Sequence, residues 1–187
     1  MRALIFDTET TGLPYHPRAK LNLQPRIIEF GALVVDHEGN ELRCMNEIID
    51  PGCAIEPIIT KITGLTNEDL KGKPKFADLL PAIIDLFSGC DVVIAHNLPF
   101  DKSMIDFEML RLGAGDFQWP RILFCTVQES LPRYGRRPKL TELYEDVVGT
   151  PLAQTHRALD DCRALAEIVI KENWIGQLND ATIASQN

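Results

Sequence analysis

Runs rich in apolar residues divide the chain into segments that predict strands. Such runs, bounded by turn-forming residues, are typical of strands that pack into a core. They occupy residues 2–6, 27–35, 41–49, 91–95 and 121–125. Residues 37–40, with the sequence His-Glu-Gly-Asn, resemble a hairpin turn, so the strands on either side of them are expected to be antiparallel neighbours.

Apolar residues at spacings of three and four predict amphipathic helices further along the chain. Helices are expected at residues 75–88, 99–112, 140–148 and from about 157 to about 174. Residues 14–26 contain three prolines and are expected to form a loop, whereas residues 51–75 should be irregular with short helical pieces. Strands that come first in a row and then alternate with helices predict a mixed α/β sheet covered by helices on both faces.

Composition and charge narrow the class of protein. The chain has 187 residues, of which 45% are hydrophobic and 25% charged, as expected for one globular domain. We see neither a membrane span nor a signal peptide, so a cytoplasmic protein without membrane association is expected. Five scattered cysteines without CxxC spacing indicate reduced thiols rather than zinc ligands or disulfides. The net charge of −8 argues against a protein that coats duplex nucleic acid, but not against a local metal site.

Two carboxylates, Asp7 and Glu9, continue the line of the first expected strand, within the sequence RALIFDTETTGL. Side chains two apart on a strand point to the same face, so these acids repel each other unless a cation lies between them. Thr10, Thr11 and Gly12 then break the strand and leave backbone N–H groups free beside the acids. Alone, an Asp-x-Glu pair is a weak signal, because the pattern is frequent by chance.

A second cluster follows the fourth expected strand, where Asn97 and Asp101 lie four positions apart. At that spacing both side chains can face one side near the end of the strand. A helix cap followed by an acidic residue favoured by the helix dipole explains the same pattern equally well.

The third cluster, with the sequence Thr-His-Arg-Ala-Leu-Asp-Asp, opens the last long helix at residues 155–161. On a regular helix, positions five apart diverge by about 140°. His156 and Asp161 therefore meet only if His156 lies in the loop before the helix, and a surface or capping histidine is the alternative. Periodicity does not separate Asp160 from Asp161.

Taken together, the motifs Asp7-x-Glu9, Asn97-x-x-x-Asp101 and His156-x-Ala158-x-x-Asp161 resemble the DEDDh, or DnaQ-like, 3′–5′ exonucleases. The match follows the order and spacing of the family, which includes the proofreading domains of bacterial DNA polymerase III. The resemblance implies a ribonuclease H-like fold, with a five-stranded mixed sheet and helices on both faces. It implies an exonuclease domain over residues 1–174 and a short C-terminal tail over residues 175–187.

The resemblance also assigns roles to the acids. Asp7, Glu9, Asp101 and Asp161 match catalytic residues that bind two Mg²⁺ or Mn²⁺ ions, and Asp160 becomes an exposed neighbour. Carboxylates without thiolates favour these ions over zinc. His156 matches the general base, and a histidine can accept a proton near neutral pH.

Substrate contacts implied by the family lie around the same motifs. The turn from Thr10 to Leu13 would hold the 3′-terminal nucleotide, with Leu13 against the base. The nearby residues that would line the path of the strand are His96, Asn97 and Phe100. The loop at residues 14–26 is expected to cover or line the 3′ end. The basic segment at residues 133–139 is either a phosphate contact or a solvated loop, and we weigh the two equally.

The expected activity is metal-dependent removal of nucleoside 5′-monophosphates from 3′ ends of single-stranded or frayed DNA. An RNA exonuclease resembling ribonuclease T or oligoribonuclease is the alternative, and a non-catalytic interaction module is a weaker one. The residues at 175–187 are too few for a polymerase-binding tail, so a stand-alone domain is expected. Recruitment to a polymerase or to other nucleic-acid machinery stays open.

Overall fold

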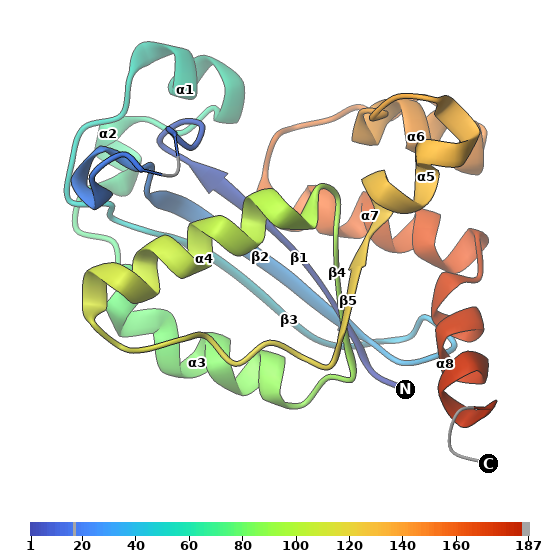
Figure 1. Cartoon of the computed structure of the whole chain (residues 1–187). Coiled ribbons are helices and arrows are strands. Elements are labelled where there is room, and N and C mark those ends of the chain that lie inside the picture. The colour runs from blue at the N-terminus through green and yellow to red at the C-terminus, as the bar shows by residue number, and fades with distance from the viewer. Residues whose placement is uncertain (17, 185–187) are drawn as a thin grey trace.

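The computed structural model describes residues 1–16 and 18–184, which fold around one five-stranded sheet with the strand order β3-β2-β1-β4-β5 (Figure 1). The strands are β1 (Ala3–Thr10), β2 (Ile27–Val35), β3 (Glu41–Ile48), β4 (Val92–Ala95) and β5 (Ile122–Cys125). Strands β1, β2 and β3 pair antiparallel, whereas β4 pairs parallel with both β1 and β5. The predicted mixed sheet is therefore confirmed. Strand β1 continues past the expected end at Phe6 as far as Thr10.

The helices agree with the sequence pattern except in two places. They are α1 (Pro57–Thr63), α2 (Asn67–Leu70), α3 (Phe76–Ser88), α4 (Leu98–Leu112), α5 (Thr126–Tyr134), α6 (Leu140–Val148), α7 (Ala158–Lys171) and α8 (Trp174–Ala184). Helix α5 is not expected from the pattern, because a proline near its end favours a break. Residues 175–184, expected to be part of a tail, belong to helix α8. This helix is held in place because Trp174 and Ile175 are buried in the core between the sheet and α7. Residues 185–187 lie outside the described residues.

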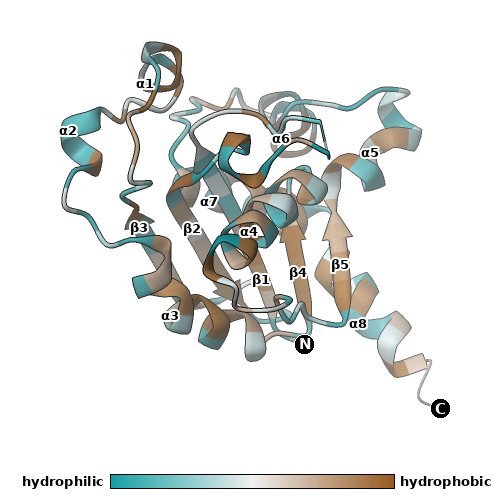
Figure 2. Cartoon of the chain, turned by 60° about the vertical axis from the view of Figure 1, so that its left-hand side comes forward, coloured by the Kyte–Doolittle hydropathy of each residue, from teal (hydrophilic) through white to brown (hydrophobic). Residues whose placement is uncertain are grey.

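The sheet separates two hydrophobic cores, because the side chains of β1 alternate between its faces. Helices α3 and α4 cover one face of the sheet and α7 covers the other (Figure 1). Leu4 and Phe6 pack in the core under α3 and α4, whereas Ala3 and Ile5 pack in the core under α7. Strand β4, covered on both faces, is almost entirely brown in the hydropathy view (Figure 2). No helix in the described ranges is long and apolar enough to span a bilayer.

The start of α7 lies against the sheet at Gly31, which pairs with Asp7 of β1. A Cβ atom at this position would collide with the backbone of Ala158 and Leu159, at the start of α7. The Sγ atom of Cys162 also donates a hydrogen bond to the Gly31 carbonyl at 3.4 Å. A glycine is therefore required here for the first turn of α7 to reach the two acids of β1.

Replacing Gly31 should test this close approach. Gly31→Ala forces backbone against backbone, so we expect the free energy of unfolding to fall by about 2–3 kcal/mol or more, as for overpacked cores. Urea denaturation followed by circular dichroism would measure the change. Gly89→Ala is the matched control, because the nearest atom to its Cβ is 3.9 Å away and its φ is −87°. Equal stability of the two variants would contradict the packing described here.

Candidate active site

The site lies at the end of β1, where this strand extends beyond its parallel neighbour. The pairing of β1 with β4 ends at Ile5, opposite Ile94. Asp7 and Glu9 follow in the same row of side chains as Ala3 and Ile5, so they face α7, and both are half-buried. The two acids therefore lie on the same face of β1, as predicted.

Asp101 reaches this edge from the opposite face of the sheet. It lies on the first turn of α4 and is buried. Its Oδ1 atom accepts hydrogen bonds from the backbone N–H of Thr8, at 3.1 Å, and from the Thr8 hydroxyl, at 2.8 Å. Because β4 no longer pairs with β1 at this point, the carboxylate takes the place of a strand partner for Thr8. The cap that sequence reasoning kept as an alternative is not formed, since Asn97 makes no side-chain cap bond to α4.

The third motif adopts the arrangement that its spacing required. His156 lies in the loop before α7, with a φ of +50° in the left-handed region that non-glycine residues rarely adopt. Asp161 is buried on the first turn of α7, and Asp160 is exposed. Gln154 donates from Nε2 to Asp161 Oδ2 at 2.8 Å, and the Thr155 hydroxyl donates to Asp160 at 2.9 Å. The structure thus separates the two neighbouring aspartates that periodicity left equivalent.

The motifs converge in space. Ligand atoms of Glu9, His156 and Asp161 all lie within 4.8 Å of one another. Burial, together with the nearby carboxylates of Asp101 and Glu9, raises the pKa of Asp7 well above its ordinary value. Buried carboxylates gathered in one place therefore dominate this edge of the sheet.

The pKa values of the other acids are shifted in the same direction. Burial, and next the charge of Asp161, raise the pKa of Glu9 to about 8, an effect that Arg157 partly offsets. Burial raises the pKa of Asp101 to about 7 despite the opposing hydrogen bonds from Thr8. The pKa of Asp161 is also raised, mainly by burial. An oxygen-rich cluster with uncompensated charge fits a hard divalent cation.

The turn after β1 presents the residues expected to contact a terminal nucleotide. Thr10 is buried, and its hydroxyl donates to the Gly12 carbonyl at 2.7 Å, so it shapes the turn. Leu13 is 77% exposed and Tyr15 is 64% exposed. Apolar side chains exposed on the turn that follows Asp7 and Glu9 are suited to contact with a base.

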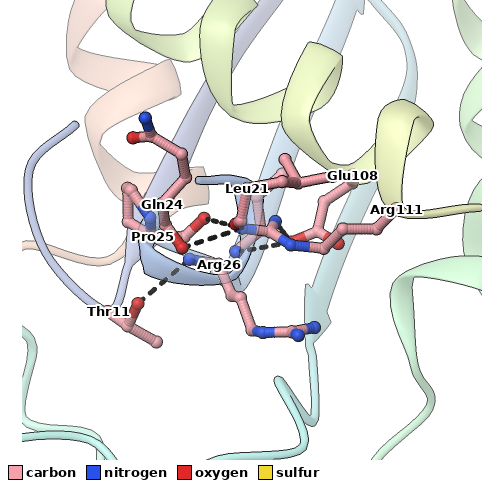
Figure 3. Close-up of polar contacts among 8 residues, drawn as sticks. Thr11, Leu21, Gln24, Pro25, Arg26, Glu108 and Arg111 are labelled. Carbon is pink, nitrogen blue, oxygen red and sulfur yellow. Dashed lines mark hydrogen bonds and ion pairs between the residues drawn. The ribbon is translucent and has the colours of Figure 1, made fainter. Parts of the chain in front are cut away.

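A buried polar network holds this turn and the loop that follows it (Figure 3). Thr11 exchanges two hydrogen bonds with the backbone of Arg26, at 2.9 and 3.0 Å. The next residue, Ile27, donates its N–H to Glu108, which forms an ion pair with Arg111 at 2.8 Å. The Arg111 guanidinium also donates to the carbonyls of Leu21, Gln24 and Pro25. Helix α4 therefore fixes the end of the loop at residues 14–26.

A cleft of about 590 Å³ opens beside His156. Its lining includes His96, Asn97, Arg137 and Lys139. Both ring nitrogens of His96 form hydrogen bonds, with the Thr126 hydroxyl at 3.0 Å and with the Pro138 carbonyl at 3.2 Å. His96 therefore forms a fixed part of the wall of this cleft.

The other two residues predicted to line the path of the strand, Asn97 and Phe100, lie in different surroundings from each other. Asn97 has a φ of +73°, and its Oδ1 atom accepts a hydrogen bond from Arg137 at 2.7 Å. Phe100 is half-buried and packs against the hydrophobic core on the α3 and α4 face. The structure thus groups His96 and Asn97 in the cleft with His156, while Phe100 contributes to core packing.

Sequence reasoning missed one charged pair at the site. Glu29, in the middle of β2, is fully buried and binds the guanidinium of Arg157. An acid that interrupts an otherwise apolar nine-residue strand is a signal that could have been recognised, because such a residue needs a buried partner.

Comparisons with known proteins place the chain in a family. A family model described as Exonuclease (RNase_T) matches residues 4–169. The DNA polymerase III subunit epsilon of Treponema pallidum (strain Nichols) is 30% identical over 164 residues, which cover 87% of this chain and 72% of that protein. The PolC-type DNA polymerase III of Caldanaerobacter subterraneus subsp. tengcongensis is also 30% identical, over 90% of this chain. The chain spans only 11% of the length of that relative.

Solved structures share the fold. Exonuclease X, in complex with 5′ overhanging duplex DNA, superposes with a TM-score of 0.66 and 23% identity, covering 90% of this chain and 89% of that chain. The nuclease domain of 3′hExo, a DEDDh family member bound to rAMP, gives a TM-score of 0.70 with 16% identity, covering 96% and 92%. The expected ribonuclease H-like fold is confirmed. Because the family model spans nearly the whole chain and the epsilon subunit aligns over most of its length, the protein belongs to the exonuclease family.

Proposed function

We propose that the protein is a metal-dependent 3′–5′ exonuclease that releases nucleoside 5′-monophosphates from single-stranded or frayed DNA ends. The observation that carries the proposal is the convergence of the three motifs. Glu9 of β1, His156 of the loop before α7 and Asp161 of α7 place their ligand atoms within 4.8 Å of one another. A buried acid from α4, Asp101, completes the set from the other face of the sheet.

Asp7, Glu9, Asp101 and Asp161 would hold the divalent cations, two Mg²⁺ or Mn²⁺ in our proposal. Such ions lower the pKa of an attacking water and neutralise charge on the leaving oxygen. The raised pKa values of the acids support this assignment, because a bound cation would relieve their mutual repulsion. Cys162 does not compete as a ligand, since burial raises the pKa of its thiol and its Sγ atom donates to Gly31.

His156 is the proposed general base. Its ring lies beside Glu9 and Asp161 and at the cleft, where a water approaching the scissile phosphate could pass its proton to a ring nitrogen. The left-handed backbone at His156 supports a functional role, because strained residues of this kind concentrate at active sites.

The substrate proposal rests on the exposed turn and the cleft. Leu13 would pack on the terminal base, while the exposed cations Arg137 and Lys139 offer phosphate contacts next to His156. A net charge of −8 favours a short single-stranded end over extended duplex contact. The relatives named as DNA polymerase III components support DNA as substrate, with proofreading or end trimming as the role and recruitment to a polymerase as a possible context.

RNA is the second candidate substrate, and a specific comparison favours it. One solved structure of the same fold concerns recognition of a histone mRNA stem-loop by a 3′-exonuclease, with a TM-score of 0.72 and 17% identity. The non-catalytic interaction module is disfavoured, because each acid and the histidine of the three motifs is present.

The Asp161→Asn variant tests the activity. The change keeps the size of the side chain but removes a charge that the cation needs, so we expect turnover to fall by more than about 100-fold. Asp160→Asn is the matched control and should stay near the activity of the unmodified protein, because an amide oxygen can still accept from Thr155. The assay follows 5′-labelled single-stranded DNA, single-stranded RNA and mismatched duplex with Mg²⁺, Mn²⁺ or EDTA. Normal turnover by Asp161→Asn, or no ladder on any substrate, would refute the proposal.

Removal of metal should make stability depend on pH. The pKa values of Glu9, about 8, and Asp101, about 7, exceed their ordinary values of 4.5 and 3.8, so the folded protein binds more protons than the unfolded chain in this window. We therefore expect the melting temperature in EDTA to fall as the pH rises from about 5 to about 8, and Mg²⁺ at the higher pH to restore it. Differential scanning calorimetry measures both effects. Glu9→Gln should flatten the dependence, and an unchanged slope in that variant would contradict the assignment.

Leu13 tests the position of the 3′ end. Leu13→Ala should raise KM about fivefold, equivalent to about 1 kcal/mol of lost apolar contact, while kcat changes little. Folding stability should stay within about 0.5 kcal/mol because the side chain is exposed. Leu42→Ala, at an exposed position on β3, is the control. An unchanged KM in Leu13→Ala would show that the terminal nucleotide does not lie on this turn.

A further inference from the structure

Glu29 is a buried acid beside the proposed metal ligands that has no assigned role. It lies directly across from Glu9 in the pairing of β2 with β1, and its exposed fraction is zero. Two carboxylates opposite each other on one face of a sheet repel. A buried position of this kind is tolerated only when a cation and hydrogen-bond donors saturate the carboxylate.

Arg157 provides that saturation with a two-point contact. Its Nε atom lies 3.1 and 3.0 Å from the two Glu29 oxygens, and its Nη2 atom lies 2.9 Å from Oε1. The backbone N–H of Ala158, the first residue of α7, also donates to Glu29 Oε2 at 3.4 Å. Both carboxylate oxygens of Glu29 thus accept hydrogen bonds. They bind the start of α7 through the Arg157 side chain and the Ala158 backbone.

Arg157 lies between the two functional residues of the third motif. It follows His156 directly, and its carbonyl accepts the N–H of Asp161 at 3.0 Å. The side-chain hydrogen bonds of Gln154 and Thr155 stay local, because both residues bond to aspartates of α7 itself. The hydrogen bonds with Glu29 connect the end of the loop to the sheet, where Asp7 and Glu9 lie.

We propose that Glu29 and Arg157 are a positioning pair that fixes the loop carrying His156 against the acids of β1. The body of α7 is held by its apolar face, which packs in the core beneath the sheet. In the preceding loop Leu152 packs against the same core, but the left-handed backbone at His156, four residues further on, needs a constraint of its own. The planar guanidinium supplies it, because two parallel bonds define an orientation that a single bond does not.

The inference rests on the proposed function of the site, and Arg157→Lys tests it. Lysine keeps the charge but loses the two-point contact. We expect kcat on a 5′-labelled single-stranded oligonucleotide to fall by about 10–100-fold, as for other residues that orient a metal site, with KM unchanged within about threefold. Thermal unfolding should stay cooperative. Glu29→Gln is the second variant, and it should reproduce the loss of kcat without a change in KM.

A second readout does not depend on turnover. In the metal-free protein, ¹H–¹⁵N spectra of the histidine rings should show a shifted or broadened His156 signal in Arg157→Lys, whereas the signals of His16, His37 and His96 stay in place. Arg43→Lys is the matched control, because Arg43 forms an exposed ion pair with Asp85 at 2.7 Å, far along the sheet from these residues. This control should change neither kcat nor the His156 signal.

The outcomes separate the two proposals. An unchanged kcat and an unchanged His156 signal in Arg157→Lys would overturn the positioning role. Shifts spread over all four histidines would also overturn it, because they would indicate a general loss of structure. If the unmodified protein degrades no DNA or RNA, the proposed function fails, and the His156 signal alone then decides the positioning inference.

Discussion

Repulsion among carboxylates at one edge of the sheet is the constraint around which this protein is built. Asp7, Glu9, Asp101 and Asp161 come from three separate elements and both faces of the sheet. Burial, and after it the repulsion between neighbouring carboxylates, raises the pKa values of Asp7 and Glu9. The two hydrophobic cores, one on each face, hold β1, α4 and α7 in place against that repulsion.

Two Glu–Arg pairs with buried carboxylates connect loops to regular elements. Glu29 and Arg157 join β2 to the loop before α7, whereas Glu108 and Arg111 join α4 to the loop after β1. Buried ion pairs add little net stability, but removing one partner typically costs about 3–5 kcal/mol. Such pairs are therefore suited to fixing the position of a loop rather than to strengthening the fold as a whole.

Local and overall electrostatics differ in this molecule. The chain carries a net charge of −8, yet the cleft beside His156 is lined by exposed Arg137 and Lys139. A phosphodiester strand would meet cations in the cleft and, under the proposed function, the carboxylate cluster beside His156, while the acidic net charge discourages broad contact with duplex. This distribution matches an enzyme that acts on a chain end rather than one that binds along a helix.

The sequence by itself determined the strand order along the chain, the mixed sheet and the three motifs, because periodicity and spacing are local properties. It also predicted that Asp7 and Glu9 share a face, and that His156 must precede the last helix to meet Asp161. Tertiary structure alone decided the rest. Helix α8 forms because Trp174 finds a buried site, Phe100 turns to the core, and Glu29 is tolerated because Arg157, 128 positions away, reaches it. Contacts between residues so distant along the chain leave no periodic signal, so only the folded molecule reveals them.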